Sequence, residues 1–421
     1  MSKHLRGEIR VGGDKSISHR AIMLAALAKG KSRLSNLARG EDVKTTLALY
    51  QRLGMEAAIA NGCVECTSAG YEALRTTESV LYCGNSGTTL RLSLGILAGT
   101  KVECRLAGDE SLNRRPVRRV IEPLRQMGGD LATAAADDRP PVQVRGRRLH
   151  GINISTSVAS AQVKSAILLA GLHADGVTSV TEPEQSRNHT EIMLKHLGCN
   201  IDVEGKTSIL SPAKRIDGFE YTVPGDVSTA VFFIVASLIM PNSELIVRDV
   251  LLNSTRTGAI DILRMMGATI LEDNVRLQHG EQVGDLVVKS STLHGCDAAN
   301  VVTARYIDEV PALAVAAMFA EGETAFHNIG ELRVKESDRA TAIVDVVKAF
   351  GGSAVVEGDT LRVCGETSGR IGQAEHLGDH RIAMMIEVIN LICSGGVSGR
   401  YGDVISVSAP EFYELIKSLD Q

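Results

Sequence analysis

The chain has 421 residues, of which 44% are hydrophobic and 23% are charged, and these values are typical of a soluble protein with two or three domains. Its formal net charge of −5 and its 3% of aromatic residues argue against a protein that binds nucleic acid or anionic membranes. The longest uncharged apolar runs, residues 229–240 and 310–320, are shorter than the roughly 20 residues that a membrane-spanning helix needs.

The N-terminus and the cysteines point to the cytoplasm. The first ten residues, MSKHLRGEIR, lack the apolar stretch of a secretory signal. The eight cysteines are then expected to be reduced. Cys63 and Cys66 form a CxxC pair, but no second pair completes a zinc site, so we interpret them as cysteines of a strand.

An apolar, small-residue-rich helical stretch recurs six times along the chain. Each copy is apolar nearly all round, which is typical of a helix buried on every side. A short strand-like run follows most copies, as in residues 102–108 and 244–250. The six stretches begin near His19, Gly87, Ala161, Asp226, Asp308 and Asp379.

A second, amphipathic helix follows in each repeat and ends on a glycine in five copies. Glycine at this place favours a left-handed C-cap. These glycines are Gly54, Gly128, Gly198, Gly267 and Gly351. Four copies continue as a predicted hairpin with a tight polar turn, in residues 58–66, 201–210, 269–278 and 354–363.

The repeat is therefore helix, strand, helix, strand, strand, and six copies of about 70 residues fill the chain. The sixth copy lacks a closing hairpin, and residues 4–11 form an unassigned strand-like run that is expected to complete the C-terminal half. A division into three and three copies, with the change near residues 224–226, predicts two domains with a ligand cleft between them. The alternative is a generic α/β protein whose repeats arise by chance from its glycine content.

Polar residues collect where the apolar helices begin, and a helix N-terminus attracts anions. The first opening places Lys15, Ser16 and Arg20 within six residues, a set that suits an anionic small molecule unless the segment is a solvated loop. It is not a P-loop, and no dinucleotide-binding GxGxxG follows a strand. At the second opening, Gly84 and Gly87 allow backbone amides to approach a phosphate or carboxylate closely, although an ordinary helix cap would look alike.

Two further clusters carry most of the charge. Four arginines at 114, 115, 118 and 119 crowd one helix start, where they need bound anions or lie on an exposed face. Residues 333–339, RVKESDR, combine with 308–309 and 379–381 to interleave carboxylates and cations. This combination suits proton transfer beside a bound anion, because flanking cations keep a carboxylate ionised. Surface ion pairing is the alternative.

Together these strings closely resemble the 5-enolpyruvylshikimate-3-phosphate (EPSP) synthase family over nearly the whole chain. The strings are GGDKSISHR at 12–20, GNSGTTLR at 84–91, ESLNRRPV at 110–117, SVASAQVKSAILLAGL at 157–172, SRNHTE at 186–191, VPGDVSTAVFF at 223–233, DEVPALAVAAMFA at 308–320, ELRVKESDRA at 331–340 and GDHRIAMM at 378–385.

The resemblance implies an α/β fold of two similar domains, an inside-out α/β barrel in which each domain has three βαβαββ units. The domains would be residues 14–226 and residues 1–13 with 227–421, joined by crossovers near Gly13 and Asp226. The implied reaction transfers the enolpyruvyl group of phosphoenolpyruvate to the 5-hydroxyl of shikimate 3-phosphate and releases phosphate. It implies a monomer that needs no metal or organic cofactor.

The resemblance also implies the roles of individual residues. Lys15, Asp308 and Glu336 are the catalytic candidates: Asp308 as base for the 5-hydroxyl, and Glu336 or Lys15 as acid for the phosphoenolpyruvate methylene. The implied partners of shikimate 3-phosphate are Lys15, Ser16, Arg20, Ser160, Gln162, Arg187, Asp308 and Lys335. The implied partners of phosphoenolpyruvate are Lys15, Gly87, Arg115, Gln162, Arg339 and Arg381.

The chain departs from the more familiar members of the family. Ala161 replaces a serine of a Ser-Ser-Gln string and Arg187 follows Ser186 directly, and both features resemble the second class of the family. Val407 stands where first-class members have a lysine that contacts phosphoenolpyruvate, and Glu331 replaces a familiar asparagine. Gly87, which is alanine in some tolerant members, indicates that the inhibitor glyphosate can enter.

Two other functions compete with this interpretation. A UDP-N-acetylglucosamine enolpyruvyl transferase would use a loop cysteine and a Lys-Asn pair, but Ser16 follows Lys15 here and the region 114–119 has no cysteine. A non-catalytic anion-binding paralogue would keep the fold as a sensor. Binding alone would not require the carboxylates of Asp308 and Glu336, which argues against the paralogue.

Overall fold

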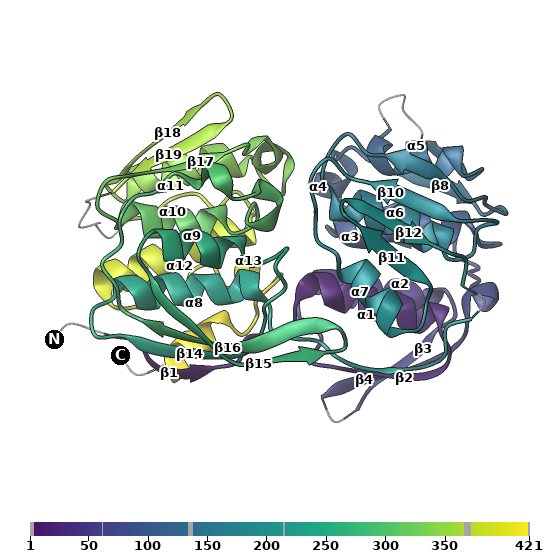
Figure 1. The fold of residues 1–421 in the computed structure, drawn as a ribbon, viewed down its shortest axis with the longest axis horizontal. Helices are drawn as coiled ribbons and strands as arrows, with labels where there is room; N and C mark the ends of the chain where they lie inside the picture. The colour runs from purple at the N-terminus through teal and green to yellow at the C-terminus, as the bar shows by residue number, and fades with distance from the viewer. Residues whose placement is uncertain (1–3, 61, 134–137, 214, 366–371, 420–421) are drawn as a thin grey trace. The chain divides into compact units, whose positions relative to one another are not determined.

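The structure is a computed structural model that describes residues 4–60, 62–133, 138–213, 215–365 and 372–419 (Figure 1). The chain forms two compact units. The N-terminal unit consists of Lys15–Val223 with His279–Glu281, and the C-terminal unit consists of Met1–Asp14, Pro224–Gln278 and Gln282–Gln421. Helices and strands alternate in both units, as expected of the α/β class.

Three apolar helices form the centre of the N-terminal unit. They are α1 (Lys15–Leu27), α3 (Gly87–Ala98) and α6 (Ala161–Gly171), and most of their side chains are buried. Small residues let these helices approach closely. A Cβ atom at Gly95 of α3 would stand 2.1 Å from the carbonyl oxygen of Ala166 in α6, so only glycine fits there. The openings of these helices carry the polar residues of interest.

Three four-stranded sheets surround those helices, and each joins a parallel strand pair to an antiparallel hairpin. The first sheet has the order β13 (Glu220–Thr222), β2 (Lys29–Ser35), β4 (Cys63–Ala69), β3 (Glu56–Ala60). The second has the order β5 (Val80–Tyr82), β6 (Glu103–Ala107), β8 (Val142–Arg145), β7 (Asp130–Thr133). The third has the order β11 (Ile201–Glu204), β12 (Thr207–Leu210), β10 (Thr178–Thr181), β9 (Asn153–Ser155). The outer helices are η1 (Tyr71–Ala73), α2 (Glu41–Arg52), α4 (Glu110–Asn113), α5 (Arg118–Gln126) and α7 (His189–His196).

The C-terminal unit repeats this plan around α8 (Val227–Ile239), α10 (Val310–Met318) and α12 (His380–Ser394), which pack on one another in its core. One sheet has the order β1 (Arg6–Ile9), β14 (Glu244–Leu251), β16 (Glu281–Lys289), β15 (Thr269–Gln278). The other has the order β17 (Glu323–His327), β19 (Thr360–Cys364), β18 (Ser353–Glu357). The remaining helices are α9 (Gly258–Met265), η2 (Ala298–Asn300), η3 (Thr303–Arg305), η4 (Gly330–Val334), α11 (Arg339–Ala349), α13 (Gly402–Ile405) and α14 (Phe412–Ser418).

The predicted repeat is confirmed in its first five copies, each of which reads helix, strand, helix, hairpin. The five predicted glycine caps are also confirmed. Gly54, Gly128, Gly198, Gly267 and Gly351 each lie two residues beyond their helix and have φ between +80° and +102°. A residue with a side chain would be strained in this conformation, which explains the choice of glycine.

The sixth copy differs because its described part, residues 372–419, holds α12, α13 and α14 and no strand. The prediction that the N-terminal strand completes the C-terminal half is confirmed, since β1 pairs in parallel with β14 from Arg6↔Glu244 to Ile9↔Val247. The backbone amide of Gly12 also donates to Glu411 Oε1 at 2.8 Å, which ties the N-terminal segment to the end of the chain.

One predicted hairpin is wrong. Residues 269–278 form the single strand β15, and the turn comes later, at His279 and Gly280. Asn274 does adopt the left-handed conformation that the polar string suggests, with φ of +50°, but its side chain donates to Asp285 Oδ2 of β16 at 2.7 Å. The irregular residue is thus absorbed within the strand. In the predicted hairpin 58–66, Asn61 lies outside the described residues.

The other expectations about the chain concern cysteines and membranes. All eight cysteines are free, and Cys63 and Cys66 both lie in β4 as predicted. Of the helices formed by the described residues, none combines the length and apolar character required to cross a bilayer.

Candidate active site

The opening of α1 gathers cations that are held by several elements of the N-terminal unit. Lys15 forms an ion pair with Asp42 of α2. Arg20 is buried, and its Nε and Nη2 donate to the hydroxyls of Thr190 and Ser165, both at 2.7 Å. Its Nη1 donates to the carbonyl oxygen of Ser16 at 2.8 Å. These oxygens hold the guanidinium in place.

Arg187 and Ser16, far apart in sequence, meet at the same opening. Arg187 Nη1 lies 3.5 Å from Ser16 Oγ. The residue before it, Ser186, is held by Glu182, whose Oε1 accepts a hydrogen bond from the Ser186 hydroxyl at 2.6 Å. The structure therefore brings together Lys15, Ser16, Arg20 and Arg187, as the anion-site prediction requires.

The openings of α3 and α6 form a second group. Ser86 caps α3 and Ser160 caps α6, accepting from the amides of Thr89 and Val163. Gln162 bridges the two helices, since its Oε1 accepts from Arg91 Nη1 at 2.6 Å and its Nε2 donates to Thr88 Oγ1 at 3.0 Å.

Gly87 lies against the arginines of this group. A Cβ atom there would come within 2.6 Å of Arg91 Nη1 and 3.7 Å of Arg115 Nη1. The glycine thus leaves room for two guanidinium groups beside the first turn of α3. Sequence analysis had quoted Arg91 within the 84–91 string but had given it no role.

The sequence allowed the four-arginine cluster either to bind anions or to lie on an exposed face, and different arginines of the cluster fit different interpretations. Arg115 Nη2 donates to Asn85 Oδ1 at 2.5 Å, which holds it at the opening of α3. Arg114 and Arg118 instead lie exposed and form ion pairs with Glu110 and Asp138. The guanidinium of Arg118 holds the pKa of the Asp138 carboxyl below its ordinary value. These two arginines are part of an exposed charged face.

The C-terminal unit gathers the carboxylates and cations of the 333–339 cluster. Lys335 Nζ donates to Asp308 Oδ1 at 3.0 Å, and Arg339 Nη1 lies 3.5 Å from the same oxygen. Arg339 Nη2 also donates to Glu336 Oε2 at 2.6 Å. The Arg339 guanidinium thus links Asp308 and Glu336, and Lys335 joins the group through Asp308.

Asp379 completes this arrangement from the cap of α12. Arg339 Nε donates to Asp379 Oδ2 at 2.7 Å, and both side chains are buried. Burial alone would lower the pKa of Arg339, but Glu336, Asp379 and Asp308 raise it above its ordinary value. Burial likewise favours the neutral form of Asp379, yet Arg339 brings its pKa below the ordinary value. Arg339 and Asp379 thus form a buried ion pair in which each favours the charged form of the other.

Arg381, in the first turn of α12, points back to the Asp308 segment. Its Nη1 donates to the carbonyl oxygen of Asp308 at 2.9 Å and lies 3.9 Å from Glu309 Oε1. Its amide donates to Asp379 Oδ1 at 2.9 Å as part of the helix cap. The Arg381 guanidinium therefore lies beside Asp308 and Glu309, while its backbone amide lies at the Asp379 cap.

Sequence reasoning missed the partner of Lys15. Asp42 begins α2 next to Glu41, where an acidic residue is expected merely to complement the helix dipole. Its ion pair with Lys15 joins two helices and could be found only from their packing. Among the described residues there is no group of three or more His, Cys, Asp or Glu side chains arranged to hold a metal ion.

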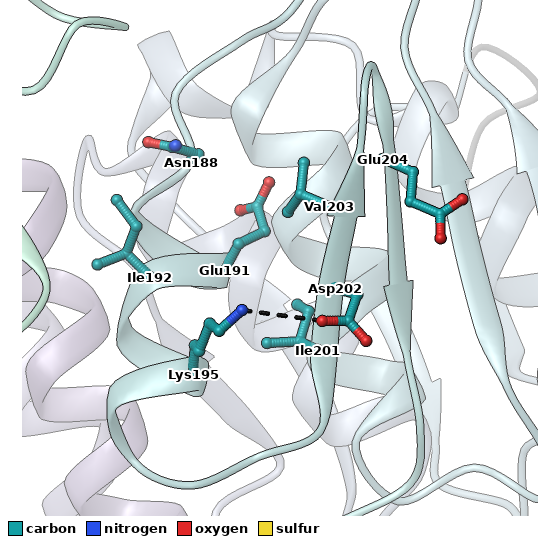
Figure 2. Close-up of a pocket in the computed structure, with 8 residues that line it drawn as sticks. All are labelled: Asn188, Glu191, Ile192, Lys195, Ile201, Asp202, Val203 and Glu204. Atoms are coloured by element: carbon teal, nitrogen blue, oxygen red, sulfur yellow. Dashed lines mark ion pairs between the residues drawn. The ribbon is translucent and has the colours of Figure 1, made fainter.

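A cavity of about 340 Å³ lies elsewhere, on the N-terminal unit between α7 and β11 (Figure 2). Figure 2 shows Lys195 pointing to Asp202, with 3.8 Å between Nζ and Oδ1. Glu191 and Glu204 add two more carboxylates to the lining. None of the described residues that line it is a predicted substrate ligand, and its acidic character opposes a phosphate or carboxylate. We assign no substrate to it.

Comparison with known proteins shows the family to which the chain is related. The family model described as EPSP synthase (3-phosphoshikimate 1-carboxyvinyltransferase) matches residues 1–416. The 3-phosphoshikimate 1-carboxyvinyltransferases of Bacillus cytotoxicus and Geobacillus kaustophilus are 42% and 44% identical to this chain, over 99% of the chain and 98% of each relative. The structure of EPSP synthase from Acinetobacter baumannii is 38% identical, has a TM-score of 0.88, and is matched over 100% of this chain and 97% of its own.

The repeated α/β units and the clusters at their helix openings thus define a transferase of the two-domain, inside-out α/β class. The chain belongs to the EPSP synthase family. It is accordingly a carboxyvinyl transferase of the shikimate pathway.

Proposed function

We propose that this protein transfers the enolpyruvyl group of phosphoenolpyruvate to the 5-hydroxyl of shikimate 3-phosphate, and that the residues at its helix openings carry the reaction. The observation that carries the proposal is the Asp308 carboxylate, which Lys335 and Arg339 hold at 3.0 and 3.5 Å beside Glu336. A carboxylate kept ionised in this way is suited to accept a proton from a hydroxyl group.

Recognition of shikimate 3-phosphate is assigned mainly to the N-terminal unit. Arg20 and Arg187 present guanidinium groups that hydroxyl and carbonyl oxygens hold in place. Guanidinium groups held in place in this way suit paired hydrogen bonds to a phosphate. The full set proposed for this substrate is Lys15, Ser16, Arg20, Ser160, Gln162 and Arg187, with Asp308 and Lys335 from the C-terminal unit.

Recognition of phosphoenolpyruvate is assigned to arginines of both units. Arg115 is held beside Gly87 by Asn85, and Arg339 and Arg381 flank Asp308. Guanidinium groups bind carboxylates and phosphates through paired hydrogen bonds, so this substrate has one suitable partner for each anionic group. The proposed set is Lys15, Gly87, Arg115, Gln162, Arg339 and Arg381.

The reaction forms a tetrahedral intermediate by addition and breaks it down by elimination. In the addition, Asp308 removes the proton of the 5-hydroxyl as its oxygen bonds to C2 of phosphoenolpyruvate, and Glu336 or Lys15 protonates C3. In the elimination, the group that protonated C3 takes a proton back from it, the C–H electron pair forms the double bond, and the C2–O bond breaks to release phosphate. A positioned acid or base typically contributes about 10² to 10⁴ in rate to such steps.

Phosphate release from the purified protein tests the proposal. The protein receives phosphoenolpyruvate with shikimate 3-phosphate, or phosphoenolpyruvate with UDP-N-acetylglucosamine, without added metal in either case. Release with the shikimate ester alone is expected. Release with the nucleotide sugar alone would assign the rival transferase, and binding of shikimate 3-phosphate without release in either reaction would favour a non-catalytic paralogue.

The proposal also covers the location of the enzyme, its domains and its inhibitor. We place the enzyme in the cytoplasm as a monomer, and its eight free cysteines suit that reducing compartment. The two compact units correspond in this proposal to the domains 14–226 and 1–13 with 227–421. Glyphosate is the proposed inhibitor, because Gly87 leaves the space beside Arg91 and Arg115 open.

A further inference from the structure

Arg256 is a buried arginine to which sequence analysis gave no role. It precedes α9 in the C-terminal unit and its side chain is 2% exposed. Its guanidinium nitrogens lie 3.6 Å from Asp14 Oδ2, 3.5 Å from Asp226 Oδ1 and 3.4 Å from Glu309 Oε1. Burial alone would lower the pKa of Arg256, but Glu309 and the aspartates raise it above its ordinary value. One cation is thus shared by three carboxylates.

Two of these carboxylates are next to proposed site residues in the sequence, and the third caps a core helix. Asp14 immediately precedes Lys15 in the sequence. Glu309 follows Asp308 and precedes the first turn of α10. Asp226 caps α8, since its Oδ1 accepts from the Ser228 amide at 2.8 Å. Arg256 therefore connects three helix openings that the sequence presents as separate features.

Glu309 extends the connection to a second cation. The Ser228 hydroxyl bonds to its Oε1, and Arg381 Nη1 lies 3.9 Å from the same oxygen. The same Arg381 nitrogen donates to the Asp308 carbonyl oxygen at 2.9 Å. Glu309 is thus held between Arg256 on one side and Arg381 on the other. Without Arg256, the carboxylate would have Arg381 as its nearest remaining cation, and the Arg381 guanidinium would be drawn toward it.

Stability is a poor explanation for such a cluster. Removing charges from water is costly, and apolar residues of similar volume often replace a buried ionic group without loss of stability. A cluster of this kind is better explained where it sets the position of neighbouring groups. Here the neighbours in the sequence are Lys15 and Asp308, and the neighbour in space is Arg381.

We propose that Arg256 is a positioning residue for the transfer reaction, which holds Asp14 and Glu309 so that Lys15, Asp308 and Arg381 keep their working orientations. The inference rests on the proposed function of those three residues. It assigns Arg256 no contact with either substrate.

The test compares Arg256→Gln and Arg256→Lys with the matched control Arg248→Gln in the full chain. Arg248 also belongs to the C-terminal unit and is paired with two carboxylates, Glu8 and Asp285. Steady-state constants are measured well below the melting temperature of each variant, and binding of shikimate 3-phosphate alone is measured by calorimetry.

Arg256→Gln is expected to lower kcat about 10²-fold, as misplacement of reacting groups does, and to raise KM for phosphoenolpyruvate. Arg256→Lys falls between this variant and the wild type, because one ammonium group cannot reach three carboxylates. Binding of shikimate 3-phosphate changes little, since six of its eight proposed partners lie in the N-terminal unit. Arg248→Gln is expected to keep both constants within about two-fold.

Wild-type constants in a folded Arg256→Gln variant would overturn the positioning role while leaving the proposed function intact. An inactive wild type would instead reject the proposed function. If Arg256→Gln fails to fold, Arg256→Lys and the charge-balanced Arg256→Gln/Glu309→Gln variant replace it. If Arg256 acts through Glu309, Glu309→Gln lowers kcat by itself. Adding Arg256→Gln or Arg256→Lys to that variant then lowers kcat little further. Independent, multiplying effects would reject that route.

Discussion

Certain arginines at the helix openings of the two units are held by different kinds of group. In the N-terminal unit, Arg20, Arg91 and Arg115 form hydrogen bonds to hydroxyl, amide and carbonyl oxygens. In the C-terminal unit, Arg256 and Arg339 are each surrounded by three carboxylates. Both arrangements hold a guanidinium in place, but the second does so mainly through ion pairs.

We propose that these two groups of arginines have different roles. Guanidinium groups attract phosphates and carboxylates, so the arginines at the N-terminal openings suit anion binding. Carboxylates held beside cations suit proton transfer, the role proposed for Asp308 and Glu336. Lys15 differs from those arginines, because it forms an ion pair with Asp42. That pairing fits its proposed place among the catalytic groups.

Replacing the proposed base is expected to have the largest effect on activity. Asp308→Asn keeps the shape of the side chain but cannot take up the hydroxyl proton, so kcat is expected to fall by about 10³ to 10⁴. Phosphate-release kinetics measure this loss, and calorimetry is expected to show that shikimate 3-phosphate still binds. Asp273→Asn, an exposed aspartate of β15, serves as the control. Near-normal turnover in Asp308→Asn would reject this residue as the base.

Removing one carboxylate beside Arg339 tests the proposed proton-transfer role with a smaller expected loss of activity. Glu336→Gln leaves Arg339 with Asp379 and Asp308, so the cation keeps its place while one acid is lost. We expect kcat to fall about 10²-fold. KM for phosphoenolpyruvate should not rise, because the charge around Arg339 becomes more positive. A pure rise in that KM would show that Glu336 serves binding instead of proton transfer.

Adding a carboxylate to the N-terminal unit is the converse experiment. Asn85→Asp would place a negative charge against Arg115, whose Nη2 lies 2.5 Å from Asn85 Oδ1. With an added carboxylate against its guanidinium, Arg115 should bind anions less well, and KM for phosphoenolpyruvate is expected to rise about 10-fold while kcat changes little. Asn200→Asp, at an exposed asparagine that bonds to Ser211, is the matched control. An unchanged KM would mean that the neutrality of the partner at Arg115 has no functional value.

Crowding the arginines without altering any charge should have a smaller effect. Gly87→Ala places a methyl group 2.6 Å from Arg91 Nη1, so this flexible guanidinium must move away from Gln162. We expect KM for phosphoenolpyruvate to rise about 3- to 10-fold, comparable with the loss of one hydrogen bond. A parallel Gly95→Ala variant is a poor control because it would disrupt helix packing, so Gly396→Ala is preferred, where a Cβ atom would meet nothing within 4 Å and φ is not left-handed. Unchanged binding would place the arginines outside the substrate site.

Acid should affect the two units in different pH ranges. Burial lowers the pKa of His173, which stacks on Tyr71, from 6.5 to about 4. Between these values the unfolded chain binds a proton that the folded N-terminal unit does not, so stability falls as the pH falls through this range. In the C-terminal unit, the pKa of Asp379 lies below 3.8, so its contribution is lost only in stronger acid.

Denaturant unfolding of His173→Phe and the wild type at pH 7 and pH 5 tests this difference. The phenyl ring preserves the stacking but cannot titrate. The wild type should lose about 1 kcal/mol more than the variant between the two pH values, after allowance for the partial exposure of the ring. Equal losses in the two proteins would show that His173 does not contribute.

The local elements could be predicted because their signals are local. The left-handed glycines at 54, 128, 198, 267 and 351 end their helices through a conformation that depends on one residue. The wrong hairpin at 269–278 shows the limit of such signals. Asn274 adopts the expected left-handed conformation, but its bond to Asp285 on the next strand keeps β15 continuous. A neighbouring strand thus overrode the turn.

The charged helix openings and the resemblance to a known family predict which residues belong to the proposed site, but not which of them form ion pairs. Asp42 lies 27 residues from its partner Lys15, and Asp379 lies 40 residues from its partner Arg339. No pattern along the chain links the members of these pairs. Arg256 gave no signal at all, because the carboxylates around it come from three distant segments. The repeat, its caps and the kinds of residue at each opening follow from the sequence, since they depend on neighbours along the chain. Which charged groups pair with one another depends on neighbours in space, and only the packing of the helices decided it.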